Sequence, residues 1–432
     1  MQNLFSLRFI TAIRTSAILL LLTISFFGCK NVGEQTINEE PEIDTPISPE
    51  TRPTEEIASL SLSNNVGFVL NNVRALSVKI MEEHIDRYCR SFVLSPLDFA
   101  IYMCMLNDVC GEDLPLESLL SDCITSISED NPKSIASLMD DIQALDLSSE
   151  FSFVNMALIN NGDGRNGAYL SSDIKKTLEQ NYYSLVSSGD FHSESFSNAV
   201  SKWSHDHSLG RINVKPDIKG LDIYLSSSIF FSCDWFNGFD LSETTDKLFH
   251  SYNSSFKLPM MNGEIKNVGY YDGEGFTSIQ LDLGQGKFAV NILLPDDKSS
   301  FDSLKEVLKA YPLDYKKEAS MFVSVPRISI TREVVNLNSL NLLGSDDLML
   351  SQNVSIPTVI RVGENILWQN NKFSIDEKGI LGMSYTYTPP SGGADGPSED
   401  ERKVFIADHP FLFKVVEKSN NIELFAGYFT GE

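Results

Sequence analysis

The sequence predicts an α+β fold, with helices near the N-terminus and large, mostly antiparallel sheets after them. Two segments with helical spacing come first, and seven strand-like segments follow from about residue 220. No regular alternation of strand and helix links the two regions, as a parallel α/β sheet would require. The order of the segments therefore favours separate helical and sheet-forming parts within one large fold.

The two helical segments lie at residues 61–83 and 97–106. In the first segment, apolar residues recur at helical spacing and share one face: Val66, Val69, Leu70, Val73 and Leu76. The second segment follows Pro96, which costs little at a helix start because that amide has no helical partner. The strand-like segments are rich in aromatic and branched residues and lie at residues 224–231, 275–283, 287–295, 321–330, 372–376, 410–416 and 422–429.

The composition is that of a globular protein with an acidic surface. The chain has 432 residues, of which 42% are hydrophobic, and its formal net charge is -25. A nucleic-acid partner is not expected, because binding a phosphate backbone requires a basic surface.

Residues 1–28 are typical of an export signal. Arg8 and Arg14 provide a basic start, and residues 17–27 form an apolar run that is short for a membrane span. Gly28 and Cys29 close this run and resemble a bacterial lipobox, which implies cleavage before Cys29 and lipidation of Cys29. The alternative is an ordinary signal peptide followed by an incidental cysteine.

Residues 29–57 are predicted to form a tether, and residues 58–432 the folded part. The tether is acidic and contains four prolines, Pro41, Pro46, Pro49 and Pro53, so it cannot bury enough apolar area to fold. We therefore expect an exported protein that a lipid on Cys29 anchors at the bacterial outer membrane, on its cell-surface or periplasmic face.

No local motif predicts an enzyme, a cofactor or a metal. The chain has no G-x-S-x-G elbow, P-loop, H-E-x-x-H or C-x-x-C motif. His205 and His207 flank Asp206, but on a helix two side chains at this spacing point in roughly opposite directions. Residues that are distant in sequence could still assemble a Ser-His-Asp triad, although nothing local supports one.

The six cysteines are too sparse for a disulfide scaffold. Cys104 lies in an apolar run and is predicted to be a buried small hydrophobe. Cys89, Cys110 and Cys123 could supply one disulfide, and their spacing does not choose a pair.

Several separated motifs, in a fixed order, resemble the serpin family. The longest is Trp235, Phe239, Thr244 and Phe249, which match the serpin spacing W-x3-F-x4-T-x4-F. The others are FVLSPL at 92–97, WSHDHSLGRI at 203–212, PMM at 259–261, ILLP at 292–295, VPRI at 325–328, FIADHPFLF at 405–413 and LFAG at 424–427. Each motif is weak alone, and their common order makes chance resemblance improbable. Trp235, Phe239 and Phe249 are interpreted as core aromatics that identify the fold and do not themselves form a site.

The resemblance implies a serpin-like fold with an exposed reactive-centre loop, here about residues 378–403. In inhibitory members of the family, a protease cuts this loop and forms an acyl-enzyme. The cut loop then inserts into a large sheet as a new central strand, which drags the protease across the molecule and distorts its active site. A target protease is therefore the expected partner, and we expect the chain to act as a monomer.

The upstream arm of the loop has the alternation that insertion needs. Glu377 and Gly379 match the serpin hinge pattern E-x-G, and the arm then departs from the family's usual Ala-rich run. One predicted inner face is small or branched and comprises Ile380, Gly382, Ser384, Thr386 and Thr388. The predicted outer face is bulky and comprises Leu381, Met383, Tyr385 and Tyr387. The alternative is an ordinary loop that follows a strand end.

Two features leave the end of the arm and the cleaved bond open. Pro389 and Pro390 oppose full insertion, because proline cannot donate to a strand ladder. Counting from the Glu377 hinge puts the reactive bond at Gly393-Ala394, and counting back from Pro410 puts it near Glu399-Asp400.

A latch between strands is also implied by the resemblance, with altered residues. Ser227 stands where the family usually has Asn, Gln369 where it has His, and Asp98, near Ser95, where a second Ser is common. Two functions remain open. One is an inhibitor that traps serine or papain-like proteases, and the other is a non-inhibitory binding or structural lipoprotein with the same fold.

Overall fold

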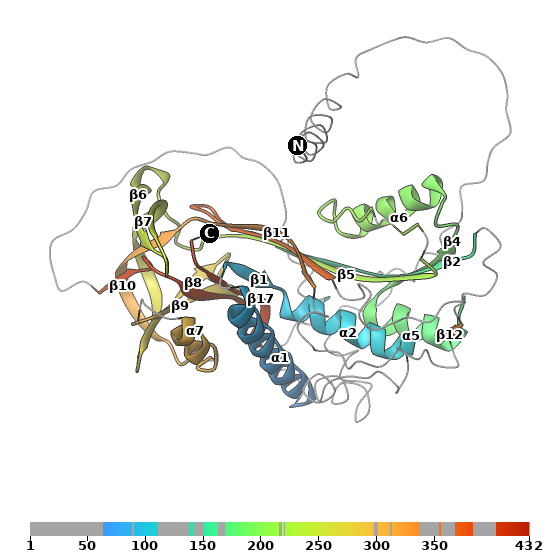
Figure 1. Cartoon of the computed structure of the whole chain (residues 1–432), viewed down its shortest axis with the longest axis horizontal. Coiled ribbons are helices and arrows are strands. Elements are labelled where there is room, and N and C mark those ends of the chain that lie inside the picture. The colour runs from blue at the N-terminus through green and yellow to red at the C-terminus, as the bar shows by residue number, and fades with distance from the viewer. Residues whose placement is uncertain are drawn as a thin grey trace, which may run out of the picture. The chain divides into compact units, whose positions relative to one another are not determined.

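The computed structural model describes residues 64–88, 90–110, 139–140, 143, 150–162, 169–215, 218–219, 221–297, 301–311, 313–336, 354–355, 368–382 and 403–431, all within one compact unit (Figure 1). Two large sheets, a two-stranded pair and the covering helices make up this part of the chain. Its helices are α1 (Asn64–Tyr88), α2 (Pro96–Cys110), α5 (Ser172–Tyr182), α6 (Glu194–His207) and α7 (Phe301–Leu308). A short 3-10 helix, η2, spans Leu241–Glu243.

The six-stranded sheet has the order β11-β13-β14-β5-β2-β4. These strands are β11 (Ile328–Asn336), β13 (Trp368–Ile375), β14 (Gly379–Gly382), β5 (Ile223–Asp234), β2 (Phe151–Asn160) and β4 (Leu185–Gly189). All neighbours are antiparallel except β2 and β4. The hinge region of the sequence therefore lies in the interior of this sheet, as the strand β14.

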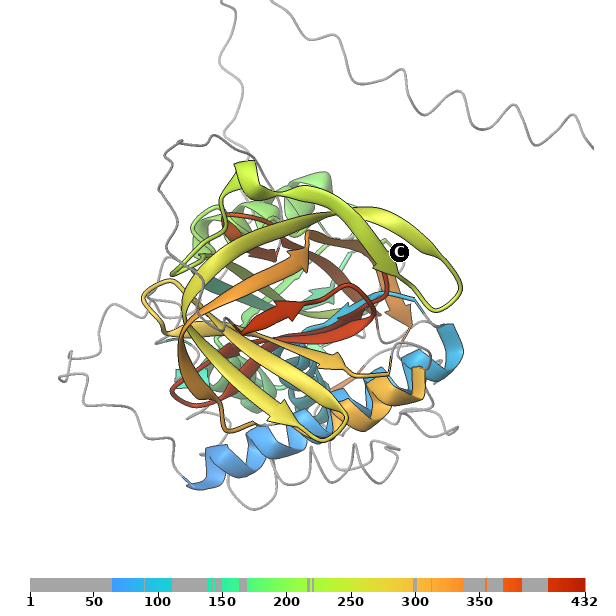
Figure 2. The ribbon, with the colours of Figure 1, turned by 90° about the vertical axis from the view of Figure 1, so that its left-hand side faces the viewer.

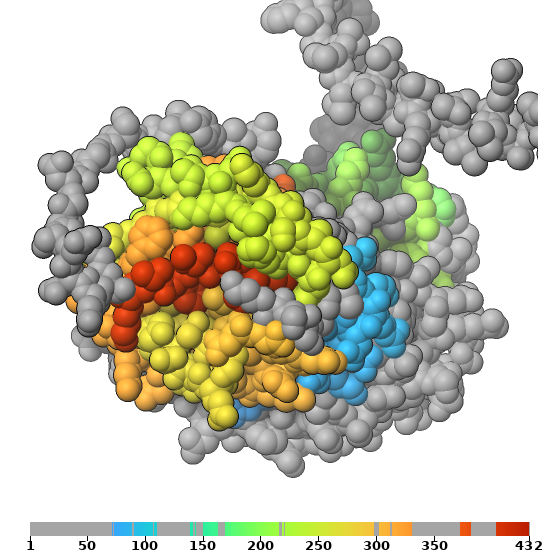
Figure 3. Space-filling view, turned by 60° about the vertical axis from the view of Figure 1, so that its left-hand side comes forward, coloured from blue at the N-terminus to red at the C-terminus, as the bar shows by residue number. Residues whose placement is uncertain are grey.

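The nine-stranded sheet follows the order β1-β17-β16-β9-β8-β7-β10-β15, and β6 also pairs with β7. Its strands are β1 (Phe92–Leu94), β17 (Ile422–Phe429), β16 (Phe411–Glu417), β9 (Phe288–Pro295), β8 (Phe276–Leu283), β7 (Ser255–Gly273), β10 (Lys316–Pro326), β15 (Val404–Ile406) and β6 (Thr245–His250). The C-terminal strands lie beside the β6–β7 hairpin on one face (Figure 3), where the amide of His250 donates to the carbonyl of Asp408. A two-stranded pair joins β12 (Val354–Ser355) to β3 (Tyr169–Leu170).

Helices cover both faces of the six-stranded sheet. The main core cluster joins the inner face of this sheet to the nine-stranded sheet and to α2 and α5, and a separate cluster packs α6 on the opposite face. Helices α1 and α7 lie side by side against the nine-stranded sheet (Figure 2), where Lys305 pairs with Asp86 across them. Among the described residues, no helix is both long and apolar enough to cross a membrane.

The predicted α+β class is confirmed, and two details of the prediction are wrong. Strands β2 and β4 precede residue 220 and form a parallel pair connected through α5, so one strand–helix–strand unit exists. Every residue of β2 is buried, because α6 covers one face and the main core covers the other. Burial on both faces removes the alternation of polarity that predicts a strand.

The segment at residues 321–330 is also two strands and not one. Strand β10 ends at Pro326 in the nine-stranded sheet, and β11 begins at Ile328 in the six-stranded sheet. Arg327 lies between them, and its amide donates to the carbonyl of Pro259. Proline has no amide hydrogen to continue a ladder, which favours the change of sheet at this point.

Candidate functional site

The hinge of the predicted loop forms a central strand of the six-stranded sheet. Strand β14 pairs with β13 through Leu381 and Ile380, opposite Ser374 and Ile375. On its other side, Gly379 to Gly382 pair with Asp234 to Phe231 of β5. The four residues after Lys378 therefore all pair with β5, and Ile380 and Leu381 also pair with β13.

Position 379 requires glycine because the backbone of β5 lies too close for a Cβ atom. A Cβ atom at this position would lie 2.0 Å from the carbonyl oxygen of Cys233 and 2.7 Å from the Cα of Asp234. Both neighbours are backbone atoms, so no side-chain rotation could make room. This close approach gives the hinge glycine a steric reason.

Glu377 is held at the entrance to β14 by two side chains from distant parts of the chain. Thr244 donates to its Oε1 at 2.5 Å, and Arg327 donates from Nε to Oε1 at 2.8 Å and to Oε2 at 3.1 Å. The Nη2 atom of Arg327 also lies 2.7 Å from Oε1, and the Glu377 side chain is only 10% exposed. Burial by itself raises the pKa of Glu377, but the hydrogen bonds from Arg327 and Thr244 outweigh it and lower the pKa below its usual value.

Trp235 fixes the turn that leads into the hinge. Its indole Nε1 donates to the carbonyl of Asp376 at 2.7 Å, and its backbone amide donates to the carbonyl of Lys378 at 2.8 Å. The ring meets the edge of Phe239 at a centroid distance of 5.7 Å and an interplanar angle of 78°. Trp235 is thus both a core aromatic and a direct support of the turn.

Asp376 stabilises the same turn through hydrogen bonds of its own side chain and backbone. Its Oδ1 accepts from the amides of Lys378 at 2.9 Å and Gly379 at 3.3 Å. Its own amide donates to the carbonyl of Gly379 at 3.0 Å. The chain therefore passes from β13 to β14 through a tight turn with its polar backbone groups satisfied.

Sequence reasoning missed the contribution of Trp235, Thr244 and Arg327 to this site. From the sequence, the two motifs that carry them, W-x3-F-x4-T-x4-F and VPRI, serve only as markers of the fold. The available signal was that these motifs supply a cation, a hydroxyl and an indole N–H, which are groups that need partners when they become buried.

Ile380 and Leu381 lie on opposite faces of β14. Ile380 is 3% exposed and belongs to the main core, beside its cross-strand partners Cys233 and Ile375. Leu381 points to the opposite face and packs against the cluster beneath α6. Ser384 and the rest of the arm lie outside the described residues.

Three of the predicted latch residues, Ser95, Asp98 and Ser227, lie together where the start of α2 meets β5. Ser227, on β5, donates to Oδ1 of Asp98 at 2.6 Å, and the amide of Asp98 donates to the hydroxyl of Ser95 at 3.3 Å. These contacts join the N-terminal end of α2 to the middle of the sheet. Gln369 lies on β13 opposite Val335, and its side chain is outside the described part of the structure.

Gly393, Ala394, Glu399 and Asp400 of the reactive bond lie outside the described residues, as does Cys29 of the lipid site.

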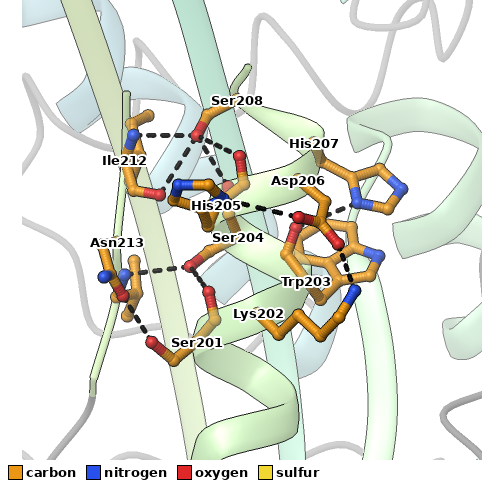
Figure 4. A network of polar contacts seen from close by, with 11 residues as sticks. Ser201, Lys202, Trp203, Ser204, His205, Asp206, His207, Ser208, Ile212 and Asn213 are labelled. Atoms are coloured by element: carbon orange, nitrogen blue, oxygen red, sulfur yellow. Dashed lines mark hydrogen bonds and ion pairs between the residues drawn. The ribbon is translucent and has the colours of Figure 1, made fainter. Parts of the chain in front are cut away.

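His205 and His207, at the end of α6, make separate contacts (Figure 4). The Nδ1 atom of His205 lies 3.4 Å from Oδ1 of Asp206, whereas His207 stacks on Trp203 and contacts its carbonyl at 3.0 Å. The part of the chain that the structure describes holds no group of three or more His, Cys, Asp or Glu residues arranged to bind a metal.

Cys104 and Cys233 are buried, and neither forms a disulfide. Burial, together with Glu150 and Asp234, raises the pKa of the Cys233 thiol to about 12. A thiol with such a pKa is protonated and unreactive at neutral pH. Cys233 therefore contributes packing beneath the hinge.

Comparison with known proteins assigns the family. The family model "Serpin (serine protease inhibitor)" matches residues 71–431, so the chain belongs to the serpin family. One relative, the "Probable non-inhibitory serpin-Z5" of Arabidopsis thaliana, is 26% identical over 422 residues and is matched over 92% of each chain. An uncharacterized serpin-like protein of Thermococcus kodakarensis is 23% identical over 53% of this chain and 54% of its own length.

Solved serpin structures share the fold. Tengpin, a thermophilic serpin in its native state, aligns with a TM-score of 0.64 at 16% identity, over 87% of this chain and 96% of its own. A cleaved Serpin 42Da aligns with a TM-score of 0.63 at 17% identity, over 85% of this chain and 98% of its own. A native and a cleaved serpin thus resemble this chain equally well, and the likeness indicates the fold alone.

Proposed function

We propose that this serpin inhibits serine or papain-like proteases by covalent trapping and loop insertion. The observation that carries the proposal is the position of β14, which lies between β13 and β5 with its entrance braced by Glu377, Arg327 and Trp235. Because the arm begins as the central strand β14, cutting the loop would allow this strand to lengthen alongside β5, toward Ile223. Each residue added gains ladder hydrogen bonds and buries a side chain.

The length of β5 supports insertion of the whole arm. Strand β5 has 12 residues, from Ile223 to Asp234. Continued from the Gly382–Phe231 pair without a bulge, the register brings Pro389 opposite Tyr224 and Pro390 opposite Ile223. The prolines would then meet the first two residues of β5, at the edge of its ladder, where a missing donor matters least. Their cost is smaller than the sequence alone suggests.

The chemistry of the trap belongs to the protease. Its serine oxygen or cysteine sulfur attacks the carbonyl of Gly393, or of Glu399 in the alternative register. The amide bond breaks, the amino group of Ala394 or Asp400 leaves with a proton, and an ester or thioester joins the arm to the protease. Insertion of the arm carries the attached protease away from the place of cleavage before water can hydrolyse the ester or thioester.

A non-inhibitory binding or structural role is the second candidate. The name of the Arabidopsis relative supports it, as does the arm sequence, because Ile380 and Leu381 replace the small residues of the family pattern. In that case the fold would be retained and the arm would not insert beyond β14.

We further propose that the chain is exported as a monomer and anchored by lipid on Cys29 at the bacterial outer membrane. The apolar run before Cys29 and the acidic, proline-rich tether at residues 29–57 support this location. Such a tether would hold the folded body away from the membrane and leave its loop accessible to proteases on the cell-surface or periplasmic face.

The proposal is tested by incubating the purified chain, in detergent, with a panel of serine and papain-like proteases. We expect at least one complex that survives SDS, together with a released C-terminal peptide that starts at Ala394 or near Asp400. Gly382→Glu is the matched control, because it puts a charge on the core-facing side of β14 and should convert trapping into simple cleavage. Cleavage without complex by every protease would favour the non-inhibitory role.

A further inference from the structure

Lys403, at the C-terminal end of the predicted loop, is held against the nine-stranded sheet by its side chain. Its Nζ atom donates to Oε1 of Glu318, on β10, at 2.6 Å, and lies 4.4 Å from the ring centroid of Tyr270, on β7. The hydrogen bond to Glu318 raises the pKa of Lys403, so its ammonium group is charged at neutral pH. A carboxylate and an aromatic face therefore hold this cation together.

The backbone of Lys403 is held as well. Its carbonyl accepts from the amide of Phe322 at 3.1 Å, and the next three residues form β15, which pairs with β10 in parallel, from Val404 opposite Phe322 to Ile406 opposite Ser324. This carbonyl belongs to the Lys403–Val404 peptide bond. A protease that cuts here must first remove the carbonyl from the sheet, because it has to enter the oxyanion hole of the enzyme.

The sequence makes these contacts relevant to the choice of protease. Between residues 379 and 403 the chain has one arginine, Arg402, and one lysine, Lys403. A trypsin-like protease recognises a basic side chain through an acidic group in its specificity pocket, so that side chain has to be free to enter the pocket. The side chain and the carbonyl of Lys403 are both engaged, whereas Arg402 lies outside the described residues.

Cleavage after Lys403 would also be unproductive for a trap. It would leave an arm, from Gly379 to Lys403, that is more than twice as long as the 12-residue strand β5 along which the arm inserts in the proposed mechanism. The excess would leave the protease on a slack tether, where its active site stays intact and hydrolyses the acyl bond. Protection of this bond would therefore favour trapping over simple cleavage.

We propose that Lys403, Glu318 and Tyr270 form an anchor that determines specificity, because it closes the Lys403–Val404 bond to proteases that cleave after lysine. The anchor ends the bait segment before Lys403 and leaves Arg402 as the basic residue of this segment that a trypsin-like protease can use. This inference rests on the proposed trapping function for its biological purpose, whereas protection of the bond is measured without any trapping.

The test treats the full chain, under native conditions, with an endopeptidase that cleaves only after lysine. Mass spectrometry follows the C-terminal fragment that starts at Val404. Glu318→Gln with Tyr270→Leu removes both contacts of the Lys403 ammonium group. Because cleavage follows the population of the locally opened state, we expect this double variant to be cut after Lys403 about tenfold faster than the wild type. Glu264→Gln is the matched control, since it removes a carboxylate of β7 that accepts from Ser320, and it should leave the rate unchanged.

A second variant guards against general loosening of the fold. Glu318→Gln alone leaves Tyr270 packed against the core and should raise the rate after Lys403 by about threefold. In the same digests, cleavage after the exposed Lys316 and Lys317 of β10 should not change. Equal acceleration at these lysines, or no acceleration after Lys403 in either variant, would overturn the anchor, as would rapid cleavage after Lys403 in the wild type. Failure of every protease to form a complex, with Lys403 still protected, would contradict the trapping function and leave the anchor standing.

Discussion

Arg327 and Glu377 form a two-point ion pair where the chain crosses between the two sheets. Arg327 separates the last residue of β10 from the first residue of β11, and Glu377 precedes β14. The pair thus connects the strand crossover to the entrance of the hinge. Thr244 completes the contacts of the carboxylate from the other side.

This pair predicts an acid-sensitive hinge. The pKa of Glu377 is lowered in the folded chain from a reference value of 4.5, so its ionised form stabilises the fold. That contribution is complete above the unfolded pKa and is lost as the pH falls through the lower folded pKa. Glu377→Gln should therefore cost stability at pH 7, by about 1–3 kcal/mol, and progressively less below about pH 4.

The measurement is the unfolding midpoint of the wild type and of Glu377→Gln between pH 3 and pH 7. Asp376→Asn, in the same turn, serves as a control for general effects of removing a carboxylate nearby. A gap between wild type and Glu377→Gln that stays constant over this range would contradict the role of the ion pair.

Two tryptophans provide a matched test of the hinge support. Nε1 of Trp235 donates to the carbonyl of Asp376, whereas Nε1 of Trp203, on α6, is buried without a hydrogen-bond partner. Substitution by phenylalanine removes a similar volume at both sites, but it breaks a hydrogen bond only at Trp235. Trp235→Phe should be more destabilising than Trp203→Phe by about 1–2 kcal/mol, as measured by denaturant unfolding. Equal losses would argue against the hydrogen bond as a support.

The glycine at the hinge is expected to be irreplaceable. Gly379→Ala puts a methyl group onto the backbone of Cys233 and should cost about 1–3 kcal/mol. Gly238→Ala is the control, since its Cβ would lie 3.4 Å from the carbonyl oxygen of Glu377, which is ordinary contact. Limited proteolysis should cut Gly379→Ala near the hinge faster than the wild type or Gly238→Ala. Similar rates for all three would contradict the closeness of β14 and β5.

A designed disulfide can test whether β14 is paired with β5 in the intact protein in solution. Trp235 and Lys378 are a hydrogen-bonded pair, so Ser232 and Leu381, three positions along, are a non-hydrogen-bonded pair with Cα atoms about 4.5 Å apart. This distance falls within the range of a disulfide. Ser232→Cys with Leu381→Cys should cross-link in the intact, uncut chain, and trapping should survive because insertion extends away from this point.

Ser232→Cys with Lys378→Cys is the out-of-register control and should stay reduced. Peptide mapping after mild oxidation shows which of the two double-cysteine variants has formed a disulfide. If neither pair cross-links before the loop is cut, β14 is not part of the sheet in the intact protein.

The membrane anchor is tested separately from the fold. We expect the mature chain to begin at Cys29 and to partition with membranes, and Cys29→Ala to release it or to block processing. Mass spectrometry of the mature N-terminus is the measurement. An N-terminus at another residue without added lipid mass would contradict the anchor and would leave the trapping proposal unaffected.

The sequence by itself determined the fold class and most strands of the second half of the chain. Strands such as β8, β9 and β17 have enough aromatic and branched residues between clear turns to be recognised locally. The ordered motifs also predicted the family and the position of the hinge at Glu377 and Gly379. The sequence did not reveal β2, because both of its faces are buried and its polarity does not alternate.

Only the tertiary structure decided how the hinge is held. Glu377 accepts hydrogen bonds from Thr244 and Arg327, which are 133 and 50 residues away, and the Trp235 indole reaches Asp376 across 141 residues. The break of the chain at Arg327 into two sheets likewise depends on partners that are remote in sequence. Such contacts follow from strand order and register, and no local pattern encodes the order in which distant strands pair.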